Sequence, residues 1–555
     1  MSAVISDTAG RSITWPKRTA LAVALAALCL LLFLPGFFSL PPMDRDEARF
    51  AQATRQMLES RDFVDIRFQD EARHKKPVGI YWMQSAAVTL AGGPEQAAIW
   101  AYRLPSLIGA TLAVLLTFWV GSSLFGPIAG FLGAVMLAGT VLLGVEARTA
   151  KTDAALFAAI VAAQGVLAGL WLRREMREAL GLGPVLLFWT ALGVGILLKG
   201  PIILLVTGGT ILWLSVAQRG IGWLAPLRPK LGLPVMLALV APWLILITVK
   251  THGSFFAESV GHDMMAKVAG GQESKGFPPG YYTLLFPVTF WPWSLLALPA
   301  IPWVWNNRRD PAVLFCLAWI IPSWLVFEAV PTKLFHYILP TYAAFALLTA
   351  RAVLDGFGKA RPWLTGAAAV LFALIALTLT GGMAALPVAV EKRFDPLSIL
   401  LALVTLAVLA YGLVLYRREW LRRSVAVLTA GAFGLYLLAF QVVFPQLETI
   451  WLSPRIAEAV WRARPCPGSV LVSAGFTEPS LVFLTGTDTV LTGDGAAAAK
   501  ALAGDACALA LVDQRQNQAF LDRAVVDNIQ PVSIETISGF NYSRGRSSLL
   551  SLYRR

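Results

Sequence analysis

Apolar residues run along this chain in stretches of about twenty, and short polar turns separate the stretches. A helix needs about 20 mostly apolar residues to cross a bilayer. The pattern therefore predicts thirteen membrane-spanning helices, at residues 18–39, 100–121, 127–145, 152–172, 183–199, 201–217, 231–250, 282–303, 311–329, 335–353, 363–383, 396–416 and 424–444.

The C-terminal part has a different pattern, in which short apolar runs alternate with helix-like runs. Buried strands are predicted near 469–472, 489–491 and 508–512, helices at 477–485, 494–503 and 516–524, and a closing strand pair at 532–537 and 547–553. The fold class predicted is thus an all-α polytopic membrane protein with a small C-terminal α/β domain. Its predicted domains are a membrane domain at 1–444, with long outer loops at 40–98 and 251–281, and a soluble domain at 445–555.

Composition agrees with this picture. The chain is 57% hydrophobic and only 14% charged, a balance that excludes an ordinary soluble globular protein. Lys and Arg concentrate in alternate turns; placing those turns inside puts the N-terminus inside and, after thirteen crossings, the C-terminus outside. The first span is not a cleaved signal peptide, because Pro41-Pro42 and acidic residues follow it. The net charge of +13 is then mainly a topology signal, and nucleic-acid binding is not needed to explain it.

Two of the four cysteines, Cys466 and Cys507, fall in the C-terminal domain. An outer compartment is oxidising, so a disulfide between them is one interpretation. Two unpaired, small apolar side chains are an equally good one. The sequence carries no Cys/His metal signature.

The segment after the first span is strongly ionic, so hydrocarbon cannot host it. Its spacing predicts an amphipathic helix that lies on the membrane with Phe50, Met57 and Phe63 facing down. Acids at a helix N-terminus account for Asp44 and Glu47. Asp46 exceeds what an N-terminus needs, which makes it a functional candidate.

Other polar residues fall on the same predicted side, in separate turns. Lys75 and Lys76 suit either lipid head groups or a lipid-linked phosphate, and Lys199 suits either an anion site or an interfacial anchor. Asp153 opens a span and is predicted to point inward. A second set, at spacing i, i+3 and i+4, is expected to share one helical face; it comprises Lys333, His336 and Tyr337.

The loop at 251–281 has the composition of a mobile lid, with a flexible point at Ala269-Gly270-Gly271. Together these features predict one outer cleft that suits a phosphate-bearing lipid.

Several short motifs follow one another in a fixed order: Asp46-Glu47-Ala48-Arg49-Phe50-Ala51, Lys76-Pro77 with Tyr81-Trp82, Arg103-Leu104-Pro105-Ser106, Arg148 with Thr152-Asp153-Ala154, Leu198-Lys199-Gly200-Pro201, and Lys333-Leu334-Phe335-His336-Tyr337 with Pro340. The series resembles the GT-C membrane glycosyltransferases that use polyprenyl-phosphate sugars. Among them it is most similar to the bacterial aminoarabinose transferases of lipid A modification. The resemblance extends over essentially the whole chain, although relatives that move other sugars share similar blocks.

The resemblance implies a donor of 4-amino-4-deoxy-L-arabinose on undecaprenyl phosphate and a lipid A acceptor. It implies a multi-pass protein of the bacterial inner membrane with a periplasmic active site, and resistance to polymyxin as the outcome. The expected catalytic residues are Asp46, Asp153 and Lys76, and the expected substrate-binding residues are Arg49, Glu47, Lys199, Lys333, His336, Tyr337 and Tyr81. Many relatives use a divalent cation, and the sequence leaves the need for a metal open.

Three other interpretations compete. A sister enzyme would move another sugar to protein or glycan. A lipid flippase or transporter would place polar residues at mid-membrane and use broken helices, often in inverted repeats. A structural scaffold with a periplasmic interaction domain would leave the outer cations unexplained.

Overall fold

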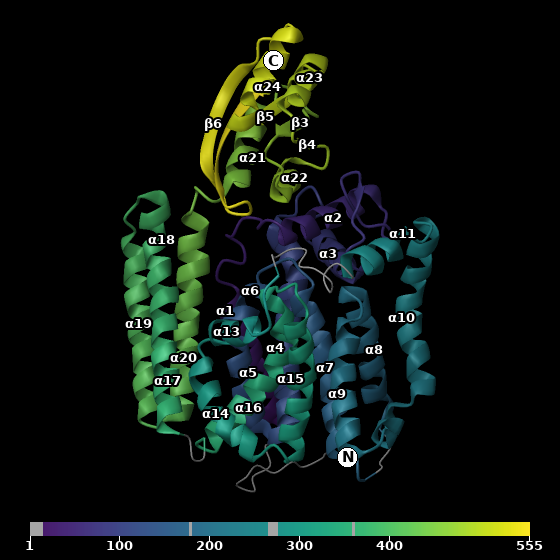
Figure 1. Cartoon of the computed structure of the whole chain (residues 1–555), viewed down its shortest axis with the longest axis vertical. Coiled ribbons are helices and arrows are strands. Elements are labelled where there is room, and N and C mark those ends of the chain that lie inside the picture. Colours follow the sequence, from purple (N-terminus) through teal and green to yellow (C-terminus); the bar gives the residue numbers. More distant parts are fainter. Residues whose placement is uncertain (1–14, 177–179, 265–275, 358–360) are drawn as a thin grey trace.

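The computed structural model describes residues 15–176, 180–264, 276–357 and 361–555. A bundle of long helices carries a smaller α/β unit above one end (Figure 1). Within the described ranges, nine helices are long and apolar enough to cross a membrane, and α5 and α9 are shorter apolar helices. The protein is therefore a multi-pass membrane protein.

Each predicted span coincides with a helical segment. In chain order these are α1 (Trp15–Phe33), α4 (Ile99–Phe125), α5 (Pro127–Ala138) with α6 (Val141–Glu146), α7 (Asp153–Leu172), α8 (Leu182–Lys199), α9 (Ile202–Gln218), α10 (Pro229–Lys250), α13 (Tyr281–Thr289) with α14 (Ser294–Asn306), α15 (Pro311–Ala329), η3 (Phe335–Thr341) with α16 (Tyr342–Leu354), α17 (Pro362–Ala376) with η4 (Leu377–Gly381) and α18 (Gly382–Glu391), α19 (Pro396–Arg417), and α20 (Leu421–Tyr436) with η5 (Leu437–Val443) and η6 (Phe444–Gln446).

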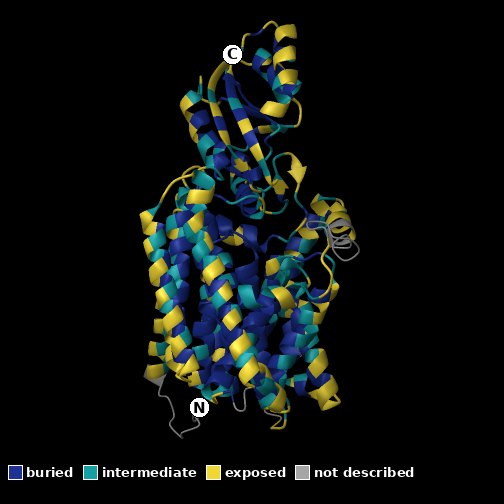
Figure 2. Ribbon diagram, turned by 60° about the vertical axis from the view of Figure 1, so that its left-hand side comes forward, coloured by how far each residue is buried: buried dark blue, intermediate teal, exposed yellow. Residues whose placement is uncertain are grey.

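Helix α7 lies at the centre of the bundle and is buried on nearly all sides. It packs closely on α4, because a Cβ added to Gly109 would lie only 2.7 Å from the backbone of Ala155. The outer helices α10 and α19 instead expose apolar side chains such as Ile245 and Leu403. Figure 2 shows this contrast between a buried interior and exposed outer faces. Exposed apolar faces of this kind are those a bilayer covers.

The first outer loop folds on top of the bundle. It contains α2 (Asp46–Ser60), a small hairpin of β1 (Arg67–Phe68) and β2 (Glu71–Ala72), and α3 (Gly79–Leu90). The amphipathic helix is confirmed, with Phe50 and Met57 buried against the bundle core. Its predicted place on the membrane surface is wrong: the bundle lies beneath it, and Phe63 lies beyond its end and is exposed.

The C-terminal unit is the predicted α/β fold. Its elements are α21 (Leu452–Ala463), β3 (Leu471–Ala474), α22 (Pro479–Thr485), β4 (Val490–Thr492), α23 (Gly495–Gly504), β5 (Leu509–Asp513), α24 (Asn517–Val526), β6 (Val532–Asn541) and β7 (Arg546–Arg554). In the described chain the strands form one sheet in the order β4-β3-β5-β7-β6, parallel among β3, β4 and β5 and antiparallel at β7 and β6. The opening helix α21 is not predicted by the sequence pattern.

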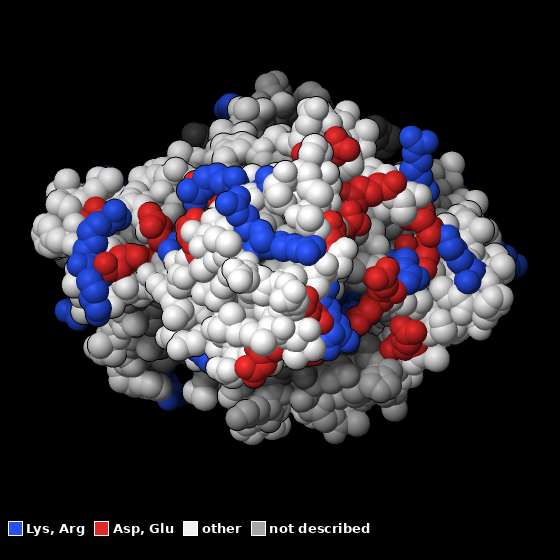
Figure 3. Space-filling model, turned by 90° about the horizontal axis from the view of Figure 1, so that it is seen from above, with Lys and Arg blue, Asp and Glu red and all other residues white. Residues whose placement is uncertain are grey.

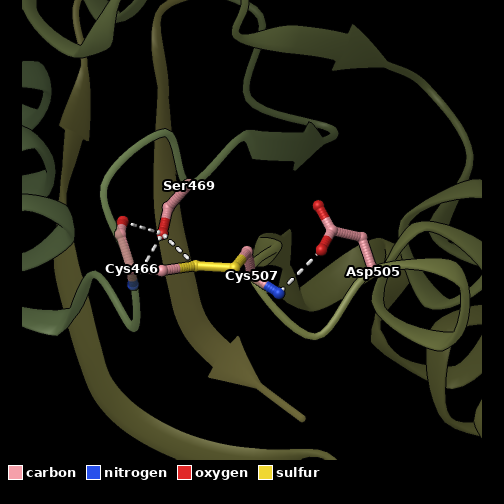
Figure 4. Close-up of a disulfide and its surroundings, with 4 residues drawn as sticks. All are labelled: Cys466, Ser469, Asp505 and Cys507. Atoms are coloured by element: carbon pink, nitrogen blue, oxygen red, sulfur yellow. Dashed lines mark hydrogen bonds between the residues drawn. A yellow bond between two sulfur atoms is a disulfide. The ribbon is translucent and has the colours of Figure 1, made fainter.

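A disulfide joins Cys466 to Cys507, which decides between the two interpretations of these cysteines (Figure 4). Their Cα atoms lie 5.8 Å apart, within the usual range. The Ser469 hydroxyl donates to the Cys466 carbonyl (2.8 Å), and the Cys507 N–H donates to the Asp505 carboxylate (2.8 Å). The bridge ties the segment before β3 to the segment before β5.

The C-terminal unit docks on α2 through α22. Phe483 of α22 is buried in an apolar cluster with Ala51 of α2 and with Tyr102 of α4, whose ring lies edge-on at 5.2 Å. The Asp44 carboxylate accepts from the Ser480 N–H (2.9 Å) and hydroxyl (2.6 Å). Helix α2 is thus held between the bundle and the C-terminal unit.

Candidate active site

Five ionisable side chains from three separate segments of the chain meet beneath α2. Asp153, the first residue of α7, accepts from Lys199 at the end of α8 (2.5 Å). Glu146, at the end of α6, accepts from Lys151 (2.9 Å). His336 of η3 lies between the two pairs, with Nε2 3.8 Å from the Asp153 carboxylate and Nδ1 3.9 Å from the Glu146 carboxylate. We refer to these five residues as the buried ionic cluster.

Both carboxylates of the cluster are paired with a cation, as buried charges must be. The Phe335 ring lies 5.5 Å from the Lys151 ammonium, and the Tyr337 ring lies 5.2 Å from the Lys199 ammonium. Burial alone would lower the pKa of Lys151, but the Glu146 and Asp153 carboxylates raise it above its usual value.

Asp46 and Lys76 lie close to this cluster. Asp46 opens α2 and is half-buried, and its charge acts on Lys151 and Tyr81. In the part of the chain that the structure describes, its carboxylate has no recorded hydrogen bond or ion pair. The charge of Lys76 acts on His336. The structure therefore brings Asp46, Lys76, Asp153, Lys199 and His336 together, with Tyr337 packed on Lys199.

Arg49 follows Asp46 by one turn of α2 and is half-buried. Its charge acts on Asp44, whose carboxylate faces the C-terminal unit. Arg49 thus lies on the same short helical stretch as Asp46, and its expected contact with a phosphate stays a prediction.

Glu47 has a different place from the one expected. Its carboxylate pairs with both Nε (2.7 Å) and Nη2 (2.8 Å) of Arg103, and it also accepts from the N–H groups of Met43 (2.8 Å) and Ala150 (2.9 Å). Arg103 in turn donates to three carbonyls of the first loop, at Phe37, Leu40 and Pro41. Because these contacts occupy both carboxylate oxygens, we assign Glu47 a positioning role: it fixes the first loop to α4.

Lys333 lies shortly after the end of α15. Its ammonium donates to the carbonyls of Phe327 (2.8 Å) and Glu328 at the end of α15. Leu334 has extended backbone, so Lys333 precedes η3. The prediction that Lys333, His336 and Tyr337 share one helical face is therefore wrong.

Tyr81 is fully buried under α2. Its hydroxyl accepts from Nε of Arg73 (3.3 Å), and its ring packs on Phe50 with 5.5 Å between the centroids. These contacts indicate that Tyr81 supports the neighbouring site residues and does not face an open cavity.

Three charged residues of one short turn, Glu146, Arg148 and Lys151, were not among the expected site residues. A signal was present, because two acids and two cations occur within the eight residues from Glu146 to Asp153. Arg148 is fully buried: it donates to the Pro35 carbonyl (2.7 Å) and stacks 4.5 Å from the Phe440 ring. It ties the exit of α1 to this turn and to the end of the α20 segment.

Residues 265–275 of the expected lid, including Ala269-Gly270-Gly271, lie outside the described residues. Its first part contacts the first loop, where His74 lies 2.8 Å from Asp65 and 3.1 Å from Glu258. Viewed from the end that carries the C-terminal unit, acidic and basic side chains lie interspersed over the molecule (Figure 3). Among the described residues, no group of three or more His, Cys, Asp or Glu side chains is arranged to hold a metal ion.

Comparison with solved structures gives a match over nearly the whole chain. ArnT from Cupriavidus metallidurans, solved bound to undecaprenyl phosphate, superposes with a TM-score of 0.75 over 97% of this chain and 98% of its own, at 20% identity. The chain has the GT-C fold. An oligosaccharyltransferase from Archaeoglobus fulgidus is a more distant match, with a TM-score of 0.52 and 12% identity over 94% of this chain and 70% of its own.

Sequence comparisons agree with the GT-C fold. The family model described as dolichyl-phosphate-mannose-protein mannosyltransferase matches residues 75–246. The undecaprenyl phosphate-alpha-4-amino-4-deoxy-L-arabinose arabinosyl transferase of Aeromonas hydrophila is 30% identical over 376 residues, and that of Aeromonas salmonicida 28% over 378 residues. These alignments cover 64% and 66% of this chain, and 65% and 66% of the relatives, just under two thirds of their length. The resemblance indicated by the ordered motifs is thereby confirmed.

Proposed function

We propose that the protein is a glycosyltransferase that moves 4-amino-4-deoxy-L-arabinose from undecaprenyl phosphate to a phosphate of lipid A. We place the reaction at the periplasmic face of the bacterial inner membrane, with resistance to polymyxin and other cationic peptides as its outcome. The observation that carries the proposal is the buried ionic cluster beneath α2, where Asp153 pairs with Lys199 (2.5 Å) and lies 3.8 Å from His336. The charges of Asp46 and Lys76 act on the same cluster. Similarity to transferases named for this donor supports the choice of sugar.

The chemistry explains why such a site needs cations more than a base. A phosphate oxygen of the acceptor attacks the anomeric carbon, and the bond from that carbon to undecaprenyl phosphate breaks. The acceptor changes from an ionised phosphate monoester to a diester, while the donor changes from a diester to a monoester. Total charge is conserved and no proton must move, so strong general-base catalysis is unnecessary. The larger task is to hold two anionic lipids together and to stabilise the leaving phosphate.

The residues divide between these tasks by charge. Lys76, Lys199 and Arg49 are the candidates for the phosphates, because ammonium and guanidinium groups bind phosphate oxygens. Asp46 and Asp153 are the candidates for the positive side of the reaction: the amine of the sugar and the positive charge that develops at the anomeric carbon. The half-buried Asp46 carboxylate lies at the start of α2, one turn before Arg49, and its charge acts on Lys151.

Substitution of Asp46 and Lys76, whose charges act on the cluster, tests the proposal. In purified enzyme with defined donor and acceptor lipids, we expect Asp46→Asn and Lys76→Ala each to lower the rate of transfer to lipid A by about 100-fold or more, the usual effect of removing one preorganised charge. The exposed Glu535→Gln variant should transfer normally. Near-normal turnover in both site variants, with the protein folded and inserted, would overturn the assignment.

A second candidate function is transfer of another sugar, or transfer to a protein or glycan. The match of residues 75–246 to a protein mannosyltransferase family favours it. A panel of polyprenyl-phosphate sugars, each offered with lipid A and with a peptide acceptor, separates the two. Turnover confined to aminoarabinose and lipid A supports the first proposal, and turnover with a mannose donor supports the second.

A further inference from the structure

A cleft of about 580 Å³ opens between the end of α16 and the turn that joins α19 to α20. Helix α20 leads from this turn toward the C-terminal unit, so the cleft lies at the opposite end of the bundle (Figure 1). Apolar residues of both segments line it, including Val353, Leu354 and Leu421. Its volume is within the range of ordinary ligand pockets.

The rim of this cleft is basic. Arg422 and Arg423 line it and are exposed, and Arg417 and Arg418 precede them in the same turn. The cleft contains one acidic residue, Glu419, also exposed. The Arg423 guanidinium stacks 4.8 Å from the ring of Trp420, which is 48% exposed. Within the described chain, Arg422 and Arg423 have no recorded ion pair.

Ordinary explanations account for part of this arrangement. Cytoplasmic turns carry Lys and Arg in general, which explains why the cations are at this end. That bias does not explain a cleft or the stacked Trp420. Helix stability does not explain the position of Arg422 and Arg423 either, since cations in the first turn of α20 oppose the helix dipole.

We propose that the cleft binds the headgroup of an anionic phospholipid from the inner leaflet. The lipid phosphate would lie between Arg422 and Arg423, with Trp420 at the level of the glycerol backbone, where Trp side chains favour the bilayer interface. Basic pockets between transmembrane helices are suited to such headgroups. The exposed apolar side chains of Tyr411 and Val414, on the last turns of α19, continue from this level into the bilayer and suit acyl chains.

The test compares two pairs of arginines on the full-length protein. Phosphatidylglycerol binding is measured by native mass spectrometry, and thermal stabilisation by phosphatidylglycerol is measured against phosphatidylcholine. We expect Arg422→Gln/Arg423→Gln to weaken phosphatidylglycerol binding at least tenfold, since each cation near an anionic surface contributes substantially. The Arg422→Lys/Arg423→Lys variant keeps both charges, so its affinity for phosphatidylglycerol should be within a few-fold of that of the natural protein. This variant also serves to show that substitution at these positions leaves the fold intact.

The matched control is Arg308→Gln/Arg309→Gln, at the α14–α15 turn. There Arg308 stacks on the exposed Trp305 at 4.4 Å, so the same charge and the same kind of pair are removed away from the cleft. Unchanged binding in this control supports the proposal. Equal losses in the two pairs, no preference for phosphatidylglycerol, or equally tight binding of free glycerol 3-phosphate would each overturn it.

Discussion

The ion pair between Glu47 and Arg103 fixes the loop that carries Asp46. Both side chains are buried and together they reach the first loop, α4 and the turn before α7. A buried pair of this kind adds little net stability compared with apolar residues, but breaking it leaves an uncompensated charge. Its effect on the site is therefore geometric, because it sets where α2 begins.

Glu47→Gln leaves Arg103 without its counter-charge. We expect this variant to lose about 3–5 kcal/mol of stability, seen as a lower melting temperature in detergent. Removing both partners, in Glu47→Leu/Arg103→Leu, should cost less than the single change. As a control, Glu535→Gln breaks the exposed pair with Arg462 and should change stability by less than about 1 kcal/mol. Equal melting of Glu47→Gln and the natural protein would refute the positioning role.

Asp44 gives the docked C-terminal unit a dependence on pH. Burial raises the pKa of Asp44 to about 6, although the hydrogen bonds from Ser480 oppose the shift. The folded state therefore holds the Asp44 proton more tightly than the unfolded chain does. The stability that the protonated carboxyl contributes is fully present below about pH 4 and is lost as the pH rises to about 6. Thermal melts of Asp44→Asn should lack this fall. The same pH slope in both proteins would contradict the prediction.

At the scale of elements, α2 is the critical helix because it packs on both layers of the molecule. Its lower side buries Phe50 and Met57 in the bundle, while Ala51 contacts Phe483 of the C-terminal unit. A helix fixed on two sides can hold Asp46 over the buried ionic cluster with little freedom of movement. Preorganisation of that kind is what electrostatic catalysis requires.

Phe483→Ala tests this arrangement. Removal of the buried ring should cost about 3–5 kcal/mol and make the junction between α22 and α2 more sensitive to protease. The rate of sugar transfer should fall as well, because α2 then holds Asp46 less firmly. Val525→Ala, at a residue 79% exposed in the same domain, should alter neither property. Protease resistance unchanged by Phe483→Ala would show that α22 does not hold α2.

The sequence predicted these elements unevenly, for physical reasons. Long apolar stretches have one stable outcome in a bilayer, so the positions of the spans and of α2 followed directly. The partners of Glu47 and Lys333 did not follow: Arg103 lies 56 residues from Glu47, and Lys333 binds carbonyls that carry no side-chain signature. Periodicity likewise suggested a membrane beneath α2, since it reports an apolar side without saying what covers it.

At the scale of the whole molecule, the proposed orientation places the C-terminal unit outside the cytoplasm. The Cys466–Cys507 bridge agrees with an oxidising compartment. Cys29 and Cys316 are buried in the bundle, so they contribute little background to thiol labelling.

Single cysteines at exposed positions test the orientation. A membrane-impermeant maleimide should label Glu95→Cys and Asp488→Cys in intact spheroplasts, and Arg309→Cys only after the membrane is opened. Labelling of Arg309→Cys together with the other two, or labelling of Glu95→Cys and Asp488→Cys from opposite sides, would invalidate the periplasmic site.

The disulfide also contributes to the stability of the C-terminal unit. It closes a loop of 41 residues, and cross-links of that length restrict the unfolded chain by about 4 kcal/mol. We expect Cys466→Ala/Cys507→Ala to lower the melting temperature of this unit while the bundle stays inserted. A melting profile identical to that of the natural protein would contradict this.

The sheet order has a consequence for biogenesis. Strand β7 is the last strand along the chain, yet it lies between β5 and β6 and pairs with both. The sheet is therefore incomplete until β7 has paired with both neighbours. A folding intermediate without β7 leaves β5 and β6 unconnected, so the addition of β7 is the step that joins the parallel strands to the antiparallel edge.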